Sequence, residues 1–169
     1  GKGNAYGGEL YIKKKSGRLT GWISYSLSKS NRKFPEINEG KSFPAKYDRR
    51  HDLSAVALYK LNQKWALSSA FVYATGNAYT QPVSRYMLAG NIVNEYGPFN
   101  GARMPAYHRM DVGATYSLKE TNRVKNTLVF SVYNLYGRQN PIYTFFQAKG
   151  KLSEYRVSIE PKSVSLMPI

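Results

Sequence analysis

The segment Arg109-Met-Asp-Val-Gly-Ala-Thr-Tyr-Ser-Leu118 decides the fold of this chain. Apolar side chains stand at every second position, and polar or small residues stand between them. Strict alternation predicts a β-strand with one face in an apolar phase and the other face in water. The segment is longer than the usual soluble strand of about 5–6 residues and matches the roughly 9–11 residues of a tilted transmembrane strand.

The same alternation recurs along the chain, so we expect an all-β, antiparallel architecture. The expected strands cover residues 5–13, 18–29, 49–61, 65–75, 109–118, 126–134, 142–147 and 152–159. Lys149-Gly-Lys151 is expected to turn the chain between the last two, and Ser163-Val-Ser-Leu166 to begin a further strand. About seven or eight strands are therefore predicted in a single segment spanning residues 1–169.

The connections between these strands alternate between short and long. Bacterial outer-membrane barrels have short periplasmic turns at one end and long extracellular loops at the other. A soluble sandwich has no reason to sort its loops in this way. We expect periplasmic turns at about 14–18, 61–64 and 119–125, and extracellular loops at about 31–48, 76–108 and 135–162.

Composition agrees with strands that cross a bilayer. The longest apolar run, Ala55-Val-Ala-Leu-Tyr59, is far shorter than the ~18 residues of a membrane helix. A hydrophobic content of 42% and a mean hydropathy of -0.50 fit a soluble domain, but also a barrel whose strands are half polar. The 15 tyrosines suit a membrane interface, although sheet packing also uses aromatic residues. The candidates for an aromatic girdle are Trp22, Tyr25, Tyr59, Trp65 and Tyr73.

The net charge of +15 has two interpretations. Basic residues among aromatic ones suit nucleic acid, which makes a soluble nucleic-acid-binding β-domain one alternative. Lysines and arginines at turns and loop bases also suit anionic lipid headgroups. The runs Lys13–Arg18 and Lys46–Arg50 fall at such places, so we expect lipid and no nucleic acid as the partner.

A weak repeat places two Arg-x-Asp motifs at strand entrances. Arg50-His-Asp-Leu-Ser-Ala55 resembles Arg109-Met-Asp-Val-Gly-Ala114, at an offset of 59 residues. Residues i and i+2 of a strand share a face, here the polar one. The candidates for facing a barrel lumen or a plug are therefore Arg50, Asp52, Arg109 and Asp111. The alternative is a structural pair at each strand end, which contributes ~0–1 kcal/mol if exposed.

No motif predicts an enzyme or a cofactor. His51 and His108 lack a third metal ligand, and Ser54 beside His51 is the nearest approach to a nucleophile and base. There is no cysteine, which excludes disulfides and thiolate metal sites. The long loops are instead rich in residues suited to recognising a polar ligand. The candidates are Tyr79, Arg85, Tyr86, Asn91, Asn94, Tyr96 and Arg103.

The chain resembles the C-terminal barrel segment of TonB-dependent outer-membrane transporters. The residues that carry the resemblance are Phe43-Pro-Ala-Lys-Tyr-Asp-Arg-Arg-His-Asp-Leu-Ser54, Tyr73-Ala-Thr-Gly-Asn-Ala-Tyr79, Arg103-Met-Pro-Ala-Tyr-His-Arg-Met-Asp111 and Val132-Tyr-Asn-Leu-Tyr-Gly-Arg-Gln-Asn-Pro141. The resemblance implies a transmembrane barrel of roughly 22 strands with an internal plug. It also implies import of a scarce nutrient (a siderophore–metal complex, cobalamin or a glycan) with energy delivered through TonB.

The implied partners follow from this resemblance. They are outer-membrane lipid and lipopolysaccharide, the remaining barrel and plug, and TonB through an N-terminal part outside this chain. A surface lipoprotein and a small-molecule or glycan ligand are further candidate partners.

Two features depart from the family. Nothing here resembles the plug or the TonB-contacting segment, and the chain stops at Leu166-Met-Pro-Ile169 without a terminal aromatic. Seven or eight strands cannot close so large a barrel, and open edges are not tolerated in lipid. We therefore expect a fragment or one piece of a split or larger assembly. The alternative is a small self-contained barrel that acts as a porin or adhesin.

Overall fold

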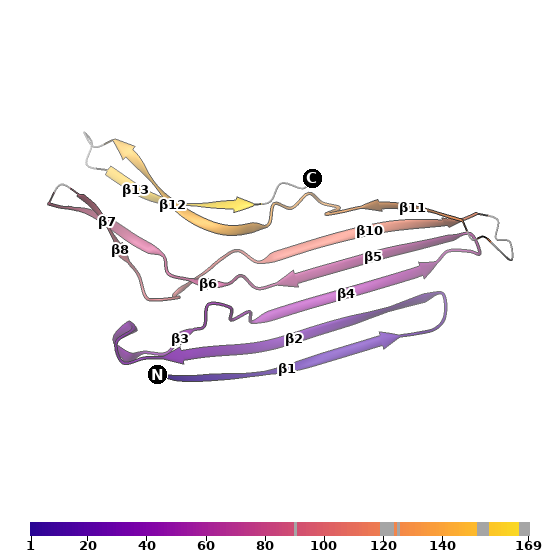
Figure 1. Ribbon diagram of the computed structural model, residues 1–169, viewed down its shortest axis with the longest axis horizontal. Helices are drawn as coiled ribbons and strands as arrows, with labels where there is room; N and C mark the ends of the chain where they lie inside the picture. Colours follow the sequence, from indigo (N-terminus) through magenta and orange to yellow (C-terminus); the bar gives the residue numbers. More distant parts are fainter. Residues whose placement is uncertain (90, 119–123, 125, 152–155, 166–169) are drawn as a thin grey trace.

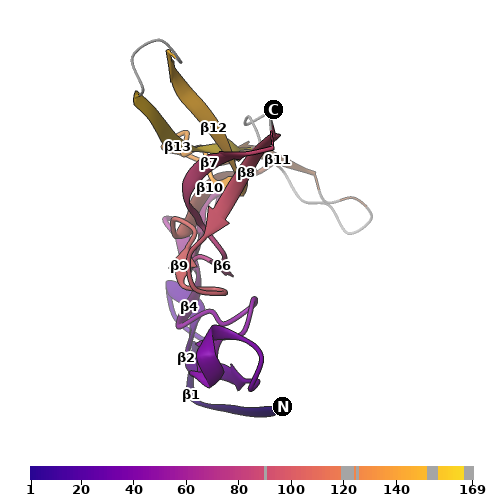
Figure 2. The same cartoon turned by 90° about the vertical axis from the view of Figure 1, so that its left-hand side faces the viewer.

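A single antiparallel sheet of long strands forms the body of the protein. The computed structural model describes residues 1–89, 91–118, 124, 126–151 and 156–165. Neighbouring strands in the sheet are joined in sequence order, and Figure 2 shows them edge-on as one layer. The order is β1 (Lys2–Lys14), β2 (Leu19–Lys33), β4 (His51–Lys60), β5 (Trp65–Ala74), β10 (Tyr107–Ser117) and β11 (Thr127–Val132) (Figure 1).

The all-β prediction is confirmed, and the main strands lie where the alternation placed them. β2 runs four residues beyond its expected end at 29, because Asn31 and Arg32 pair with β3 (Phe43–Pro44). The sheet is open within the described residues, since β1 and β11 are its two edges. No helix there is long and apolar enough to cross a membrane.

The register carries the alternation of each strand across the whole sheet. Ile23 pairs with Ala55, Ala55 with Phe71, and Phe71 with Met110. Paired residues of antiparallel strands point to the same side. One side, the apolar face, therefore collects Leu10, Ile12, Leu19, Ile23, Leu27, Leu53, Ala55, Ala57, Leu67, Phe71, Met110, Val112, Ala114, Leu128, Phe130 and Val132. The other side, the polar face, collects Thr20, Ser24, Ser26, Ser28, Asp52, Ser54, Ala66, Ser68, Arg109, Asp111, Thr115, Ser117, Thr127 and Ser131.

Nothing in the described structure covers the apolar face. Ile12 is 56% exposed, Ile23 48% and Phe130 59%. The buried hydrophobic residues are instead Phe43, Ala45, Ala74 and Ala78, all at the end of the sheet with the long loops. The central strands thus form no core of their own and present a large apolar surface outward.

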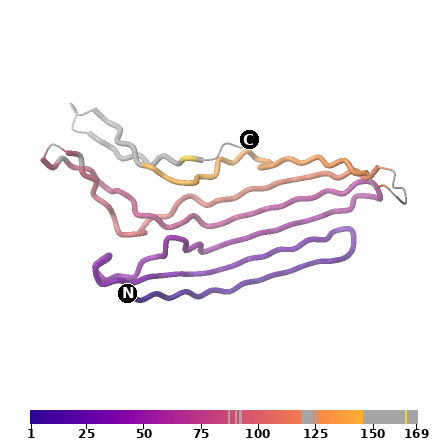
Figure 3. The backbone as a smooth tube through the Cα atoms, in the orientation of Figure 1, coloured from indigo at the N-terminus to yellow at the C-terminus, as the bar shows by residue number. Residues whose placement is uncertain are grey.

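The expected separation of short turns from long connections is visible in Figure 1. The expected loop at 31–48 holds β3 and a short 3-10 helix (Asn38–Gly40). The expected loop at 76–108 is largely a hairpin that continues β5 and β10, and Figure 3 shows it bending away from their line. Its strands are β6 (Ala78–Tyr79), β7 (Pro82–Leu88), β8 (Asn91–Tyr96) and β9 (Ala102–Arg103), paired as β6–β9 and β7–β8.

Two expectations for the C-terminal hairpin are wrong. Lys149-Gly-Lys151 is not a turn but the end of β12 (Pro141–Lys151), paired with Arg156–Ser158. Ser163–Ser165 does not begin a new strand but completes β13 (Arg156–Ser165). Turn-like composition misled the prediction, because backbone pairing with the opposite strand continues through the Lys-Gly-Lys segment. The expected turn at 119–125 lies outside the described residues except for Val124.

Candidate functional site

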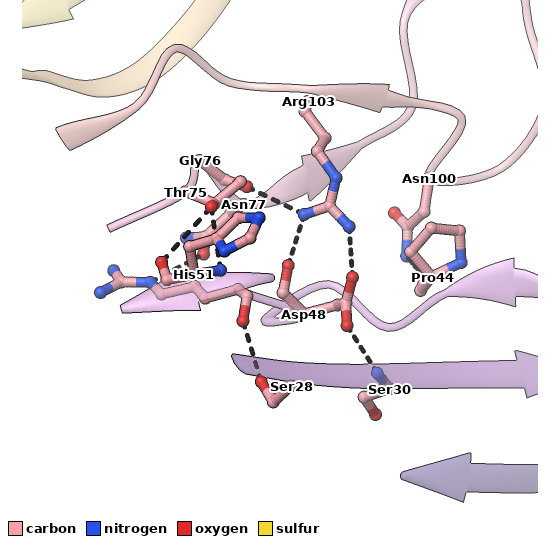
Figure 4. A network of polar contacts seen from close by, with 11 residues as sticks. Ser28, Ser30, Pro44, Asp48, His51, Thr75, Gly76, Asn77, Asn100 and Arg103 are labelled. Atoms are coloured by element: carbon pink, nitrogen blue, oxygen red, sulfur yellow. Dashed lines mark hydrogen bonds and ion pairs between the residues drawn. The ribbon is translucent and has the colours of Figure 1, made fainter. Parts of the chain in front are cut away.

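A buried ion pair joins the loop after β2 to the hairpin after β5. The Asp48 side chain is fully buried and pairs with the Arg103 guanidinium across 55 residues of sequence. The other carboxylate oxygen of Asp48 accepts a hydrogen bond from the Ser30 backbone N–H (Figure 4). Arg103 also donates to the backbone carbonyl of Gly76 at 3.2 Å. We call Asp48, Arg103 and Ser30 the loop latch.

Further contacts tie the same two segments together. The Asn38 side chain accepts from the Phe99 N–H at 2.6 Å and donates to the Phe99 carbonyl at 3.0 Å. The Asn100 amide donates to the Pro44 carbonyl at 3.0 Å, and the rings of Phe43 and Phe99 meet edge to face at 5.2 Å. The base of the long connections is therefore a built structure and not a pair of independent loops.

A polar hollow of about 620 Å³ opens beside the loop latch. Three arginines, two tyrosines and three asparagines give it a basic, hydrogen-bonding wall. These residues are Arg49, Arg109, Arg138, Tyr107, Tyr133, Asn77, Asn134 and Asn140. At its edge, a Cβ on Gly76 would lie 1.8 Å from the Met104 carbonyl oxygen. Only glycine therefore allows these two backbone segments to approach so closely.

Arg109 is held firmly in the wall of this hollow. Its guanidinium pairs with the Asp111 carboxylate at 2.9 Å and donates to the hydroxyls of Tyr107 and Tyr133. It also lies over the Tyr133 ring, 4.2 Å from the centroid. The second oxygen of Asp111 accepts from the Asn134 N–H at 2.9 Å. Since every strong donor has a partner, Arg109 positions the tyrosines and contributes less free charge.

Arg138 supplies the uncompensated charge of the polar hollow. It donates to the Ala106 carbonyl at 2.9 Å and to the Asn140 side-chain oxygen at 3.2 Å, both of which are neutral. Arg49 has only a distant carboxylate, with 3.8 Å between its guanidinium and Asp52. A wall of this kind suits a polar ligand that carries an anionic group.

The structure separates the two Arg-x-Asp motifs. Arg109 and Asp111 form a pair on the polar face, as in the structural alternative, whereas Asp52 pairs with Arg49 and not with Arg50. The Arg50 Nε is buried and has no hydrogen-bond partner among the described residues. The two motifs also lie at different positions along the strands. Asp52 and Tyr107 both pair with Ala74, so Asp52 is level with Tyr107 and not with Asp111.

The candidate ligand residues lie on the long hairpin, away from the polar hollow. Arg103 belongs to the loop latch and Tyr79 lies in the short β6–β9 pair. Those on β7 and β8 are Arg85, Tyr86, Asn91, Asn94 and Tyr96, of which Arg85 pairs with Asn94 in the register. Sequence reasoning did not select the hollow residues Arg49, Arg138 and Asn140. The sequence pattern around these three residues gave little indication of a site, because all three lie in irregular segments without a periodic pattern.

Four of the five girdle candidates lie on the apolar face and form two rows with other rings. Tyr25 stacks near His51 at 6.2 Å and Tyr73 near His108 at 6.5 Å, at the loop end. Trp65 meets Tyr116 at 4.8 Å at the turn end. The loop-end row comprises Tyr25, His51, Tyr73, His108 and Tyr136, and the turn-end row comprises Tyr59, Trp65 and Tyr116. The fifth candidate, Trp22, lies on the polar face beside Tyr11.

The two histidines belong to the loop-end row. The Nδ1 atom of His51 is hydrogen-bonded to the Tyr25 hydroxyl, and that of His108 to the Tyr136 hydroxyl, each at 2.8 Å. Nowhere in the described ranges do three or more metal-ligating side chains cluster. A spacing of eight residues marks the rows in the sequence on three strands, at His51/Tyr59, Trp65/Tyr73 and His108/Tyr116.

Comparison with known proteins finds no matching family model, no matching curated protein and no matching solved structure.

Proposed function

We propose that this chain forms part of the wall of an outer-membrane β-barrel that imports a scarce nutrient with energy from TonB. The observation that carries the proposal is the apolar face, which continues through six paired strands and has no cover in the described structure. In water this surface would be an aggregation hazard. Against lipid it is the surface that a transmembrane barrel needs.

The spacing of the two aromatic rows supports a bilayer as the apolar phase. Eight residues separate the rows on β4, β5 and β10, which is about 26 Å along a strand. A strand tilt of ~40° shortens this to about 20 Å of height. Outer-membrane barrels carry an apolar band about 25 Å tall between girdles of aromatic residues. The separation of about 20 Å between the two aromatic rows is close to the height of such a band.

The polar face supports a water-filled or plugged lumen on the other side. Arg109 and Asp111 are paired there, and the polar hollow opens at the end with the long connections. In this proposal the hollow and the long hairpins capture the ligand before it passes inward. The ligand is a siderophore–metal complex, cobalamin or a glycan, and no chemical step is catalysed.

Paired cysteine variants test the membrane-facing side. The chain has no cysteine, so single spin labels at Ile23→Cys and Ser24→Cys report adjacent residues on opposite faces. In reconstituted bilayers, the label at 23 is expected to be relaxed mainly by oxygen, which concentrates in lipid. The label at 24 is expected to respond mainly to a water-soluble nickel complex. Equal nickel accessibility at both sites would contradict the proposal and favour a soluble basic β-domain.

A genetic comparison tests dependence on TonB. Three strains of the source bacterium are made, lacking this gene, the gene for TonB, or both, and their spent media are compared by untargeted mass spectrometry. We expect the compound that accumulates in the first strain to accumulate equally in the TonB-deficient strain, and the double deletion to add nothing. A compound that is still imported without TonB would instead indicate a porin.

A further inference from the structure

Four neutral side chains that line the polar hollow already accept hydrogen bonds from the protein itself. They are Thr75, Asn77, Asn134 and Asn140. The Asn77 Oδ1 accepts from the Arg49 Nε at 3.4 Å. The Asn140 Oδ1 accepts twice, from the His108 backbone N–H at 3.0 Å and from the Arg138 Nε at 3.2 Å. The oxygens of these side chains therefore have little capacity left to accept from a ligand.

The two tyrosines of the polar hollow are set to donate. The hydroxyl oxygens of Tyr107 and Tyr133 both accept from the Arg109 guanidinium. A phenol that accepts from a cation keeps its O–H for donation, and polarisation by the cation strengthens that donor. Because Asp111 balances the charge of Arg109 at 2.9 Å, Arg109 orients these two donors without requiring an anion of its own.

Two further cations reach the polar hollow from opposite sides. Arg49 precedes β4 and is anchored on Asn77, whereas Arg138 follows β11 and is anchored on the Ala106 carbonyl. The anchors lie on adjacent backbone segments, because the Met104 N–H donates to the Asn77 carbonyl at 2.9 Å and Ala106 is two residues beyond Met104. One strand spacing and a two-residue step separate the anchors by about 8 Å. The two guanidiniums therefore converge on the middle of the hollow.

The polar hollow thus offers donors and positive charge but few acceptors. Arg138 forms no ion pair with a described residue. The contact of Arg49 with Asp52 at 3.8 Å is half exposed to water, where ion pairs are weak. A neutral sugar brings a donor with every hydroxyl, and those donors would lack partners here. A carboxylate brings acceptors only.

We propose that the polar hollow binds an acidic ligand through a carboxylate held between Arg49 and Arg138. The hydroxyls of Tyr107 and Tyr133 donate to further oxygens of the same ligand. The two oxygens of a carboxylate match the guanidinium fork, and acidic metal chelates and acidic glycans both carry this group. This inference rests on the proposed function and names its substrate class, which is an acidic compound and not a neutral glycan.

The compound that accumulates in the medium of the strain lacking this gene tests the chemistry. At pH 7 it is expected to be retained by an anion-exchange resin and to lose carbon dioxide in tandem mass spectrometry, as a carboxylate does. Bound metal in the retained fraction would identify a chelate, and release of uronic acids on hydrolysis would identify a glycan. A compound that passes through the resin uncharged would overturn the inference.

Two double variants of equal charge loss test the position of the carboxylate. Arg49→Gln with Arg138→Gln is expected to slow import of the accumulated compound at least about tenfold, because two charged hydrogen-bond donors are lost. The control, Arg18→Gln with Arg32→Gln, also removes two arginine charges but lies outside the polar hollow, so import should continue at the wild-type rate. Immunoblots of the outer membrane verify that both variants are present in equal amounts.

Two conservative variants distinguish a binding role from a structural one. Arg138→Lys keeps the charge and loses the fork, so it should retain more import than Arg138→Gln. Tyr133→Phe keeps the ring beneath Arg109 and removes only the hydroxyl. It should raise the KM for import about threefold and leave the maximal rate unchanged.

The outcomes separate this inference from the proposed function. If no compound accumulates in the strain lacking this gene, the proposed import fails and this inference fails with it. If a neutral compound accumulates, import stands but the acidic substrate does not. If an acidic compound accumulates and the variant lacking both Arg49 and Arg138 imports it as fast as the control, the carboxylate is not bound in the polar hollow.

Discussion

Replacing Asp48 with alanine is expected to lower the free energy of unfolding by about 3 kcal/mol, as for other buried ion pairs that lose one partner. The change leaves the Arg103 guanidinium without its carboxylate and the Ser30 N–H without its acceptor. We use the lower end of the usual 3–5 kcal/mol because 30% of the Arg103 side chain is exposed and water can reach it. Denaturant unfolding in lipid vesicles measures this difference.

A second carboxylate in the same connection gives the matched control. Glu39 pairs with Lys41, but both side chains are more than three-quarters exposed. Glu39→Ala should therefore change stability by less than about 1 kcal/mol. The Asp48 variant should also expose the connections 34–50 and 76–106 to protease, whereas the Glu39 variant should not. Equal stability of the two variants would show that the loop latch is not a structural tie.

Introducing arginine at Ala55 is expected to lower the free energy of unfolding in a bilayer by about 2–4 kcal/mol. Ala55 lies midway between His51 and Tyr59, which belong to the two aromatic rows. A charge there meets the centre of the proposed apolar band, where no water solvates it. Equilibrium unfolding of the reconstituted protein, compared with the wild type, provides the measurement.

The adjacent residue supplies the control for this prediction. Ser54 lies on the polar face of the same strand, so Ser54→Arg should cost less than about 1 kcal/mol. A soluble sheet with two wetted faces predicts no such contrast, because arginine would be solvated on either face. Similar stabilities for the two variants would therefore contradict the membrane orientation.

The alternation in β2, β4, β5 and β10 was sufficient to predict these strands and their faces. Leu53 and Leu67 were assigned correctly to one face because side chains of a strand alternate by geometry, whatever its neighbours. Trp22 was predicted to join the girdle because it is aromatic, but its position next to Ile23 on β2 places it on the polar face. Residues 82–96 were expected to be part of a loop, because prolines, asparagines and glycines recur through 76–98, but a paired hairpin forms there.

The candidate site was predicted in part, for a similar reason. The pairing of Arg109 with Asp111 agrees with the structural alternative, because residues i and i+2 of a strand are always neighbours on one face. Arg50 and Asp52 have the same spacing, but Arg50 precedes the first residue of β4 and does not follow the strand geometry. Arg138 was missed because no periodic pattern governs the segment after β11.

The sequence by itself determined the strands and which side chains share a face, because the two-residue period is a property of the extended backbone. Only the tertiary structure decided the partners across the sheet, the pairing of Asp48 with Arg103 and the residues around the polar hollow. These contacts join residues far apart in the chain, and their selection depends on registers and loop paths that local geometry does not specify. The eight-residue aromatic spacing was present in the sequence, but it became two continuous rows only when the register aligned the strands.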